Sequence, residues 1–112
     1  MWCVAIKPIP KKALIHNIEY REFIGSDGWN GEYAEPLPIQ NVRVVPVTSL
    51  SRDANAIQDD STHVVYVDAK NSSELPTFKT QSKVIWDYQE FEVNVVKPQY
   101  GFTLHHYELE LK

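Results

Sequence analysis

The 112-residue sequence contains one cysteine, four glycines and no long apolar run. The single Cys3 cannot form an internal disulfide, so packing has to stabilise the core. The apolar N-terminal segment ends at Lys7, whereas a helix needs roughly 20 apolar residues to span a bilayer. Basic residues follow this segment, which is the reverse of their order in a signal peptide. We therefore expect no membrane partner.

The excess of charge of one sign is also small. The 11 basic and 15 acidic residues leave a formal net charge of −4, and only Lys11 and Lys12 form an adjacent basic pair. Domains that bind nucleic acid usually carry a basic stripe, because phosphate contacts supply much of the affinity. The composition therefore disfavours tight DNA or RNA binding, while it allows DNA to pass without specific binding.

Catalytic and cofactor motifs are missing as well. The sequence holds no phosphate-binding Gly-x-x-x-x-Gly-Lys loop, no Gly-x-Ser-x-Gly elbow and no His-Glu-x-x-His. The adjacent His105 and His106 would point to opposite faces of a strand, so they are not expected to share a metal ion. Carboxylates in loops or on polar strand faces are expected to be solvated: Asp59, Asp60, Glu90, Glu92, Glu108 and Glu110. We predict that the protein is not an enzyme and has no metal or cofactor.

Apolar and polar residues alternate with a period of two along much of the chain, which is typical of strands. The C-terminal third shows this best, with three faces of alternating apolar residues: Val84, Trp86 and Tyr88; Phe91, Val93 and Val95; Tyr107, Leu109 and Leu111. The first two sets predict a hairpin that turns at residues 87–90, and the third predicts a half-buried closing strand. Trp86 is expected in the core. Further strands are expected over residues 13–23, 39–48 and 63–68.

Loop signals separate these strands. Three of the four glycines lie within residues 25–31, which predicts a turn there. Residues 49–62 are polar and predict a mobile loop, with a weak helix over 52–58 as the alternative. Residues 71–80 and 98–102 are expected to be loops as well. The predicted fold is a mainly β single domain over residues 1–112, a small antiparallel β-barrel or sandwich with long loops and at most one short helix.

The order of these segments resembles a known family. The chain carries "LIHNIEY", a "GSDGWNGEYAEP" turn, "VRVVP", "VVYVDA", "FKTQSKVIWDYQEFEVNVVKP" and a closing "HHYELEL". This order is similar to that of the small minor capsid proteins encoded between portal and tail genes in siphophages of Gram-positive hosts. The resemblance covers about residues 5–111. The sequence departs from the family pattern at residues 87–90, where family members often carry an Asn-Gly turn.

The resemblance implies a head-completion protein of the stopper type. Such a protein would form a ring of its own copies below the portal, join head to tail, and close the DNA channel. Its expected partners are a portal or adaptor protein, tail terminator or tail-tube proteins, and genomic DNA that passes without specific binding. Its expected location is the neck of the virion, after a period in the host cytoplasm before assembly.

Interface candidates lie in an N-terminal arm (residues 1–12), the turn at residues 25–35 and the C-terminal strand. They are Trp2, Ile6, Trp29, Tyr33, His105 and His106. Trp29 is one of them because a large aromatic side chain in a turn gains little from its own domain, and exposed aromatic residues mark contact sites. For Trp2 the alternative is simple closure of the end of the barrel.

The loop over residues 49–60 is the candidate for facing the DNA channel. Its charged residues are Arg52, Asp53, Asp59 and Asp60, and the carboxylates would repel DNA phosphates. The alternative function is a small β-barrel binding module for nucleic acid or a peptide. A nucleic-acid module would need a basic strand face with interleaved aromatic residues.

Overall fold

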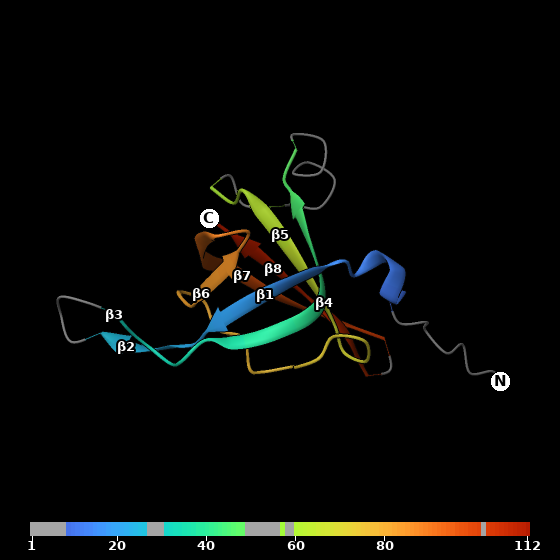
Figure 1. Ribbon diagram of the computed structural model, residues 1–112, viewed down its shortest axis with the longest axis horizontal. Helices are drawn as coiled ribbons and strands as arrows, with labels where there is room; N and C mark the ends of the chain where they lie inside the picture. The colour runs from blue at the N-terminus through green and yellow to red at the C-terminus, as the bar shows by residue number, and fades with distance from the viewer. Residues whose placement is uncertain (1–8, 27–30, 49–56, 58–59, 102) are drawn as a thin grey trace.

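The computed structural model is a closed barrel of six antiparallel strands with a two-stranded ribbon projecting from one end (Figure 1). It describes residues 9–26, 31–48, 57, 60–101 and 103–112. Around the barrel the strands are β1 (His16–Arg21), β4 (Leu37–Pro46), β5 (His63–Asp68), β8 (Leu104–Leu111), β7 (Gln89–Tyr100) and β6 (Lys83–Trp86), and β6 pairs back with β1. The ribbon consists of β2 (Phe23–Ser26) and β3 (Gly31–Tyr33), and a 3-10 turn, η1 (Lys11–Ala13), precedes β1. The predicted mainly β barrel is confirmed.

Strand alternation places one apolar row per strand inside the barrel. Val65 and Val67 of β5 are fully buried, and they pair with Leu109 and Tyr107 of β8. Burial of each aliphatic side chain stabilises the fold by roughly 1.5–3 kcal/mol. The described part of the chain holds no helix long and apolar enough to cross a membrane.

The β7–β8 ladder contains two bulges, one on each strand. Asn94 is the extra residue of β7, because Val93 pairs with Leu111 but Val95 already pairs with Glu110. His105 is the extra residue of β8, between the pairs Gln99–His106 and Tyr100–Leu104. Each bulge changes which side chains point outward.

The first bulge makes one sequence prediction wrong. Val95 was expected on the inner face with Phe91 and Val93, but Val96 packs against the core instead. The extra residue shifts the alternation by one, so Val95 lies on the same face as Glu110. A period of two in the sequence carries no sign of this shift.

The predicted hairpin is confirmed, and it turns on only two residues. Trp86 pairs with Gln89, and the residues between them, Asp87 and Tyr88, both have positive φ, at 53° and 62°. That is the pattern of a type I′ turn, which matches the twist of the flanking strands. Trp86 packs against the core as expected. Tyr88 was expected on its face, but its side chain is fully exposed because it lies in the turn.

Relieving the backbone of this turn is expected to stabilise the barrel. Asp87→Asn with Tyr88→Gly should raise the free energy of unfolding by roughly 1 kcal/mol. Both turn residues adopt the left-handed region, and Asn-Gly is a preferred pair for such a turn. Urea unfolding followed by circular dichroism measures the change. Tyr88→Ala is the matched control: it removes the ring but keeps Cβ, so it should give little gain. An equal gain from the double variant and from Tyr88→Ala would show that the backbone conformation of this turn is not the source of the gain.

The C-terminal loop prediction is also wrong, because β7 continues through Pro98 and Gln99 to Tyr100. The pairing of β6 with β7 ends at Glu92, so the C-terminal part of β7 pairs with β8 alone. Pro98, which has no backbone N–H, is tolerated in such a part of a strand. Pro46, by contrast, ends β4 as its ring predicts. Most of the expected loop over 49–62, with its alternative helix over 52–58, lies outside the described residues.

Candidate functional site

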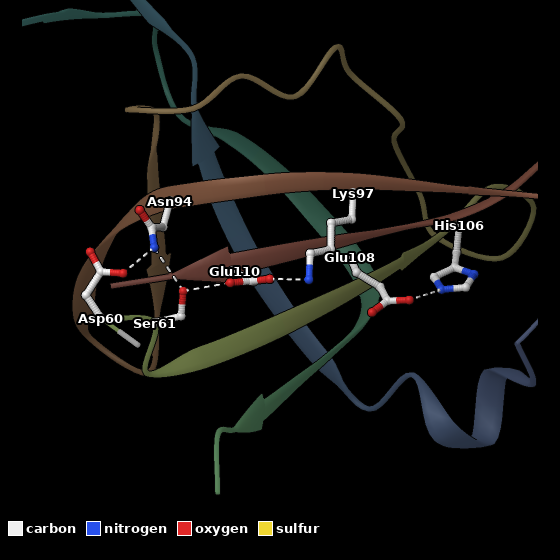
Figure 2. Close-up of polar contacts among 7 residues, drawn as sticks. All are labelled: Asp60, Ser61, Asn94, Lys97, His106, Glu108 and Glu110. Atoms are coloured by element: carbon white, nitrogen blue, oxygen red, sulfur yellow. Dashed lines mark hydrogen bonds and ion pairs between the residues drawn. The ribbon is translucent and has the colours of Figure 1, made fainter. Parts of the chain in front are cut away.

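A chain of polar side chains crosses the outer face of β7 and β8 (Figure 2). At the β7 bulge, the Asn94 amide donates to Asp60 Oδ1 at 2.8 Å and to Ser61 Oγ at 3.0 Å. Ser61 Oγ donates to Glu110 Oε1 at 2.9 Å, and Lys97 Nζ lies 2.5 Å from Glu110 Oε2. The bulge therefore aims an amide at the point where the 49–62 segment rejoins the barrel.

Glu110 is the buried centre of this chain, which corrects the expectation of a solvated carboxylate. It is only 1% exposed, although it points away from the barrel interior. A buried carboxylate needs a cation and hydrogen-bond donors, and Lys97 and Ser61 supply them. Asp60 remains exposed, with Lys112 Nζ 3.7 Å from its carboxylate.

The second bulge brings His105 and His106 together, contrary to the expectation that adjacent strand residues point apart. Their Nδ1 atoms are 2.7 Å apart, and His106 Nε2 is 3.0 Å from Glu108 Oε2. Because an ionised carboxylate only accepts, His106 donates from Nε2 to Glu108. The contact between the two Nδ1 atoms needs a proton on one of them, and the tautomers of the rings decide on which. The extra residue of the bulge explains why both rings reach the same side.

This histidine pair continues onto β5 through Tyr66. The rings of Tyr66 and His106 are 6.1 Å apart. Burial raises the pKa of Tyr66, and the nearby Glu108 charge adds to that effect. Among the described residues, no group of three or more His, Cys, Asp or Glu side chains is placed to hold a metal ion. The arrangement is a set of polar contacts on the outer face of β5 and β8.

Tyr33 lies at the base of the ribbon and is half-buried. Its ring packs edge-on against Phe23 at 5.6 Å, and Arg21 and Lys83 lie 5.8 and 5.6 Å from its centroid. Arg21 Nε also donates to the carbonyl oxygen of Ala34 at 3.0 Å. Of the interface candidates, Tyr33 therefore has a visible role in holding the ribbon onto the barrel.

A buried cluster below the ribbon was missed by sequence reasoning. Ser82 Oγ accepts from the Phe23 N–H at 2.9 Å and from the Tyr20 hydroxyl at 3.0 Å. That hydroxyl in turn accepts from the Lys79 N–H at 2.8 Å. Ser82 is fully buried and Tyr20 is 2% exposed, so the cluster sets where β2 leaves the barrel. A serine in a polar loop gives no sequence signal for this role.

The chain before η1 is tied to the end of β5. Asp68, 1% exposed, accepts from the Ile9 N–H at 2.9 Å, and the Asn71 amide donates to the Ile9 carbonyl oxygen at 2.7 Å. This tie was also missed, because an aspartate at a strand end normally signals only a turn. It sets where the N-terminal segment joins the barrel.

Of the predicted site residues, the structure describes Tyr33, Asp60, His105 and His106, and it brings only the two histidines into contact. Tyr33 lies at the end of β3, in the ribbon. Asp60 and His106 lie at opposite ends of the row of polar side chains in Figure 2. Six predicted residues lie outside the described residues: Trp2, Ile6, Trp29, Arg52, Asp53 and Asp59.

The structure is a barrel with anchored surface segments. The family model described as minor capsid protein matches residues 10–111. The chain belongs to the minor capsid protein family. No curated protein and no solved structure matches it.

Family membership gives this minor capsid protein a structural role in the virion, where it interacts with other virion components. The match spans all six barrel strands and the ribbon, so the polar chain and the ribbon base both fall inside the family region. A structural virion role accords with the resemblance noted from the sequence.

The minor capsid barrel is expected to lose stability as the pH falls from about 7 to 5. His16 Nδ1 accepts the Val44 N–H at 2.9 Å, so a proton on Nδ1 would break this bond. The pKa of His16 is lowered by burial and by Arg43, against a smaller opposing effect of Asp87, and burial lowers the pKa of His63. The unfolded chain then binds protons more readily below about pH 6.5, which favours unfolding.

Urea unfolding at several pH values measures this dependence. His16→Asn is the matched control, because its amide oxygen can replace Nδ1 as acceptor without titrating. The control should therefore show a shallower slope between about pH 7 and 5. An unchanged slope in His16→Asn would assign the dependence to other groups.

Proposed function

We propose that this minor capsid protein forms a ring below the portal, in the neck of the virion, where it joins head to tail. In this proposal its partners are further copies of itself, the portal or adaptor protein, and tail terminator or tail-tube proteins. The loop over residues 49–60, within the polar segment 49–62, faces the DNA channel and obstructs it as a stopper. Genomic DNA passes the ring without specific binding.

The observation that carries the proposal is the way the barrel clamps both ends of that segment. Val47 N–H donates to the Thr62 carbonyl oxygen at 2.9 Å, and Thr62 N–H donates to that of Leu111 at 2.7 Å. The Asn94, Ser61 and Glu110 contacts then fix the C-terminal root. A segment held on a closed barrel can be presented to a channel at one defined position.

The charge of the neighbouring face supports passage of DNA. The outward groups of β8 are His106, Glu108 and Glu110, and Asp60 is exposed beside them. Lys97 is committed to Glu110. Lys112 likewise lies beside the carboxylates of Asp60 and Glu92. The two described lysines of this face are therefore paired with acidic groups, so they offer phosphates no free basic stripe.

Shortening the clamped segment tests its role at the channel. Residues 52–59 are replaced by a short Gly-Ser link that leaves Asp60 and Ser61 in place. We expect particles that assemble but lose packaged DNA, measured as nuclease-sensitive DNA per particle. The matched control, Asp53→Asn with Asp59→Asn, keeps the length and should retain DNA. Full retention by the shortened variant would contradict the stopper role.

Binding to heads tests the position in the neck. Purified protein is mixed with portal-bearing heads and with heads that lack the portal, and the bound fraction is measured by co-sedimentation. We expect binding only where the portal is present. Binding to free DNA or to an unrelated peptide, without binding to heads, would favour the alternative binding module.

A further inference from the structure

Exposed charges of opposite sign lie at the two ends of the molecule. The ribbon projects at one end and η1 lies at the other (Figure 1). Glu32 and Glu35 are exposed at the ribbon, while Lys11 and Lys12 are exposed on η1. Within the described residues none of these four makes an ion pair. The cations at the ribbon base, Arg21 and Lys83, are held against Tyr33.

Apolar features accompany the charges at both ends. On the ribbon, Ile24 is 61% exposed. Beside η1 lies a groove of about 220 Å³ with a largely aliphatic and aromatic lining: Ile9, Ala13, Arg43, Val45 and Tyr66. A cavity of roughly 150 Å³ accepts a benzene-sized group, so this groove can hold one isoleucine side chain.

The ribbon has a physical reason to be covered. A two-stranded hairpin is only marginally stable in water, and among the described strands β2 and β3 pair only with each other. Its base is anchored, since Ser82 and Arg21 bond to Phe23 and Ala34. The ribbon is therefore a projection with a defined direction.

We propose that the ribbon of one copy docks beside η1 of a second copy. Ile24 enters the groove, and Glu32 and Glu35 face Lys11 and Lys12. The contact joins two different surfaces, so it repeats from copy to copy as a ring requires. This docking contact rests on the proposed function, because it assumes the ring, and it specifies which two surfaces of neighbouring copies would form that ring.

Paired cysteines test this contact in a Cys3→Ser background. The double variant Gly25→Cys/Ala13→Cys keeps Ile24, and a Cβ at Gly25 meets no atom within 4 Å. It is treated with a short bis-maleimide, both free at high concentration and bound to portal-bearing heads. We expect a ladder of dimers, trimers and larger species on a denaturing gel. A mixture of the two single variants should give dimers that contain one of each chain. A product that stops at the dimer in the double variant would overturn the proposal.

Charge reversal tests the facing pairs. Lys12→Glu in the paired-cysteine chain should reduce the ladder several-fold at low salt, and adding Glu32→Lys should restore it. Glu74→Lys, a reversal at an exposed loop position, is the matched control and should not restore it. Equal restoration by Glu32→Lys and Glu74→Lys would show that only the net charge matters, and it would overturn the proposed pairing.

The two proposals fail in different ways. Binding to heads with no ladder in either sample would leave the neck position standing and overturn the docking contact. Cross-links from Gly25→Cys only to a head protein would also overturn it, because the occupant would be a different chain. A ladder from free protein that does not bind heads would keep the contact and contradict the neck position.

Discussion

Tyr20→Ala is expected to lower the free energy of unfolding by roughly 4 kcal/mol, the largest loss for a single side chain outside the aliphatic core. The ring is 2% exposed and packs edge-on against Phe78 at 5.0 Å. Its hydroxyl lies between Ser82 Oγ and the Lys79 N–H. Truncation therefore removes both apolar packing and a buried hydrogen-bond centre. Domains of this size are stable by only 5–15 kcal/mol, so the loss is large.

Tyr20→Phe separates the two contributions. It keeps the ring and removes the hydroxyl, so it should cost roughly 1–3 kcal/mol, the range for leaving buried polar groups unsatisfied. Urea unfolding measures both variants. Tyr100→Ala, at a tyrosine that is 69% exposed, is the control and should change stability by less than about 0.5 kcal/mol.

The same cluster should control the ribbon. The Tyr20 hydroxyl bonds to Ser82 Oγ, which in turn accepts the Phe23 N–H, so removal of the hydroxyl in Tyr20→Phe should speed up hydrogen exchange at Phe23. Exchange at Val65, deep in the barrel, should change only with global stability. Unchanged exchange at Phe23 would show that the ribbon base does not depend on this cluster.

Lys97→Met is expected to lower the free energy of unfolding by roughly 3 kcal/mol. It removes a positive charge 2.5 Å from a carboxylate that is 1% exposed, while the methionine keeps most of the apolar stem. Lys97 is itself 28% exposed, which places the loss at the lower end for broken buried pairs. Chemical unfolding at about pH 7 measures it.

A double-mutant cycle isolates the pair. Glu110→Gln keeps an acceptor for Ser61 Oγ and removes the charge, so Lys97→Met should cost much less in that background. Lys83→Met is the matched control, since its partner Glu90 is exposed and the pair is worth less than about 1 kcal/mol. Equal losses for Lys97→Met in both backgrounds would show that the pair does not stabilise the barrel.

The sequence predicted the barrel because its strands have one buried face. Alternation in residues 107–111 places Leu109 and Leu111 inside, as the structure confirms. The continuous apolar run in residues 63–68 predicts a strand buried on both faces, and Val64 is indeed buried together with Val65 and Val67. The predicted resemblance to minor capsid proteins is likewise confirmed by the family match. Alternation is a local property of neighbouring residues, so it can be recognised without knowing which strands pair.

The site could not be predicted in the same way. The single-residue bulges at Asn94 and His105 depend on the register of β7 against β8, and they decide that the two histidine rings meet and that Val96 replaces Val95 in the core. Burial of Glu110 depends on residues from separate segments that fold over it. The sequence by itself determined the fold class and the family, because both follow from local patterns. Only the tertiary structure decided the chain of polar side chains on β7 and β8, the ribbon base and the placement of opposite charges at the two ends. Each of these features depends on how segments distant in the sequence are arranged in space.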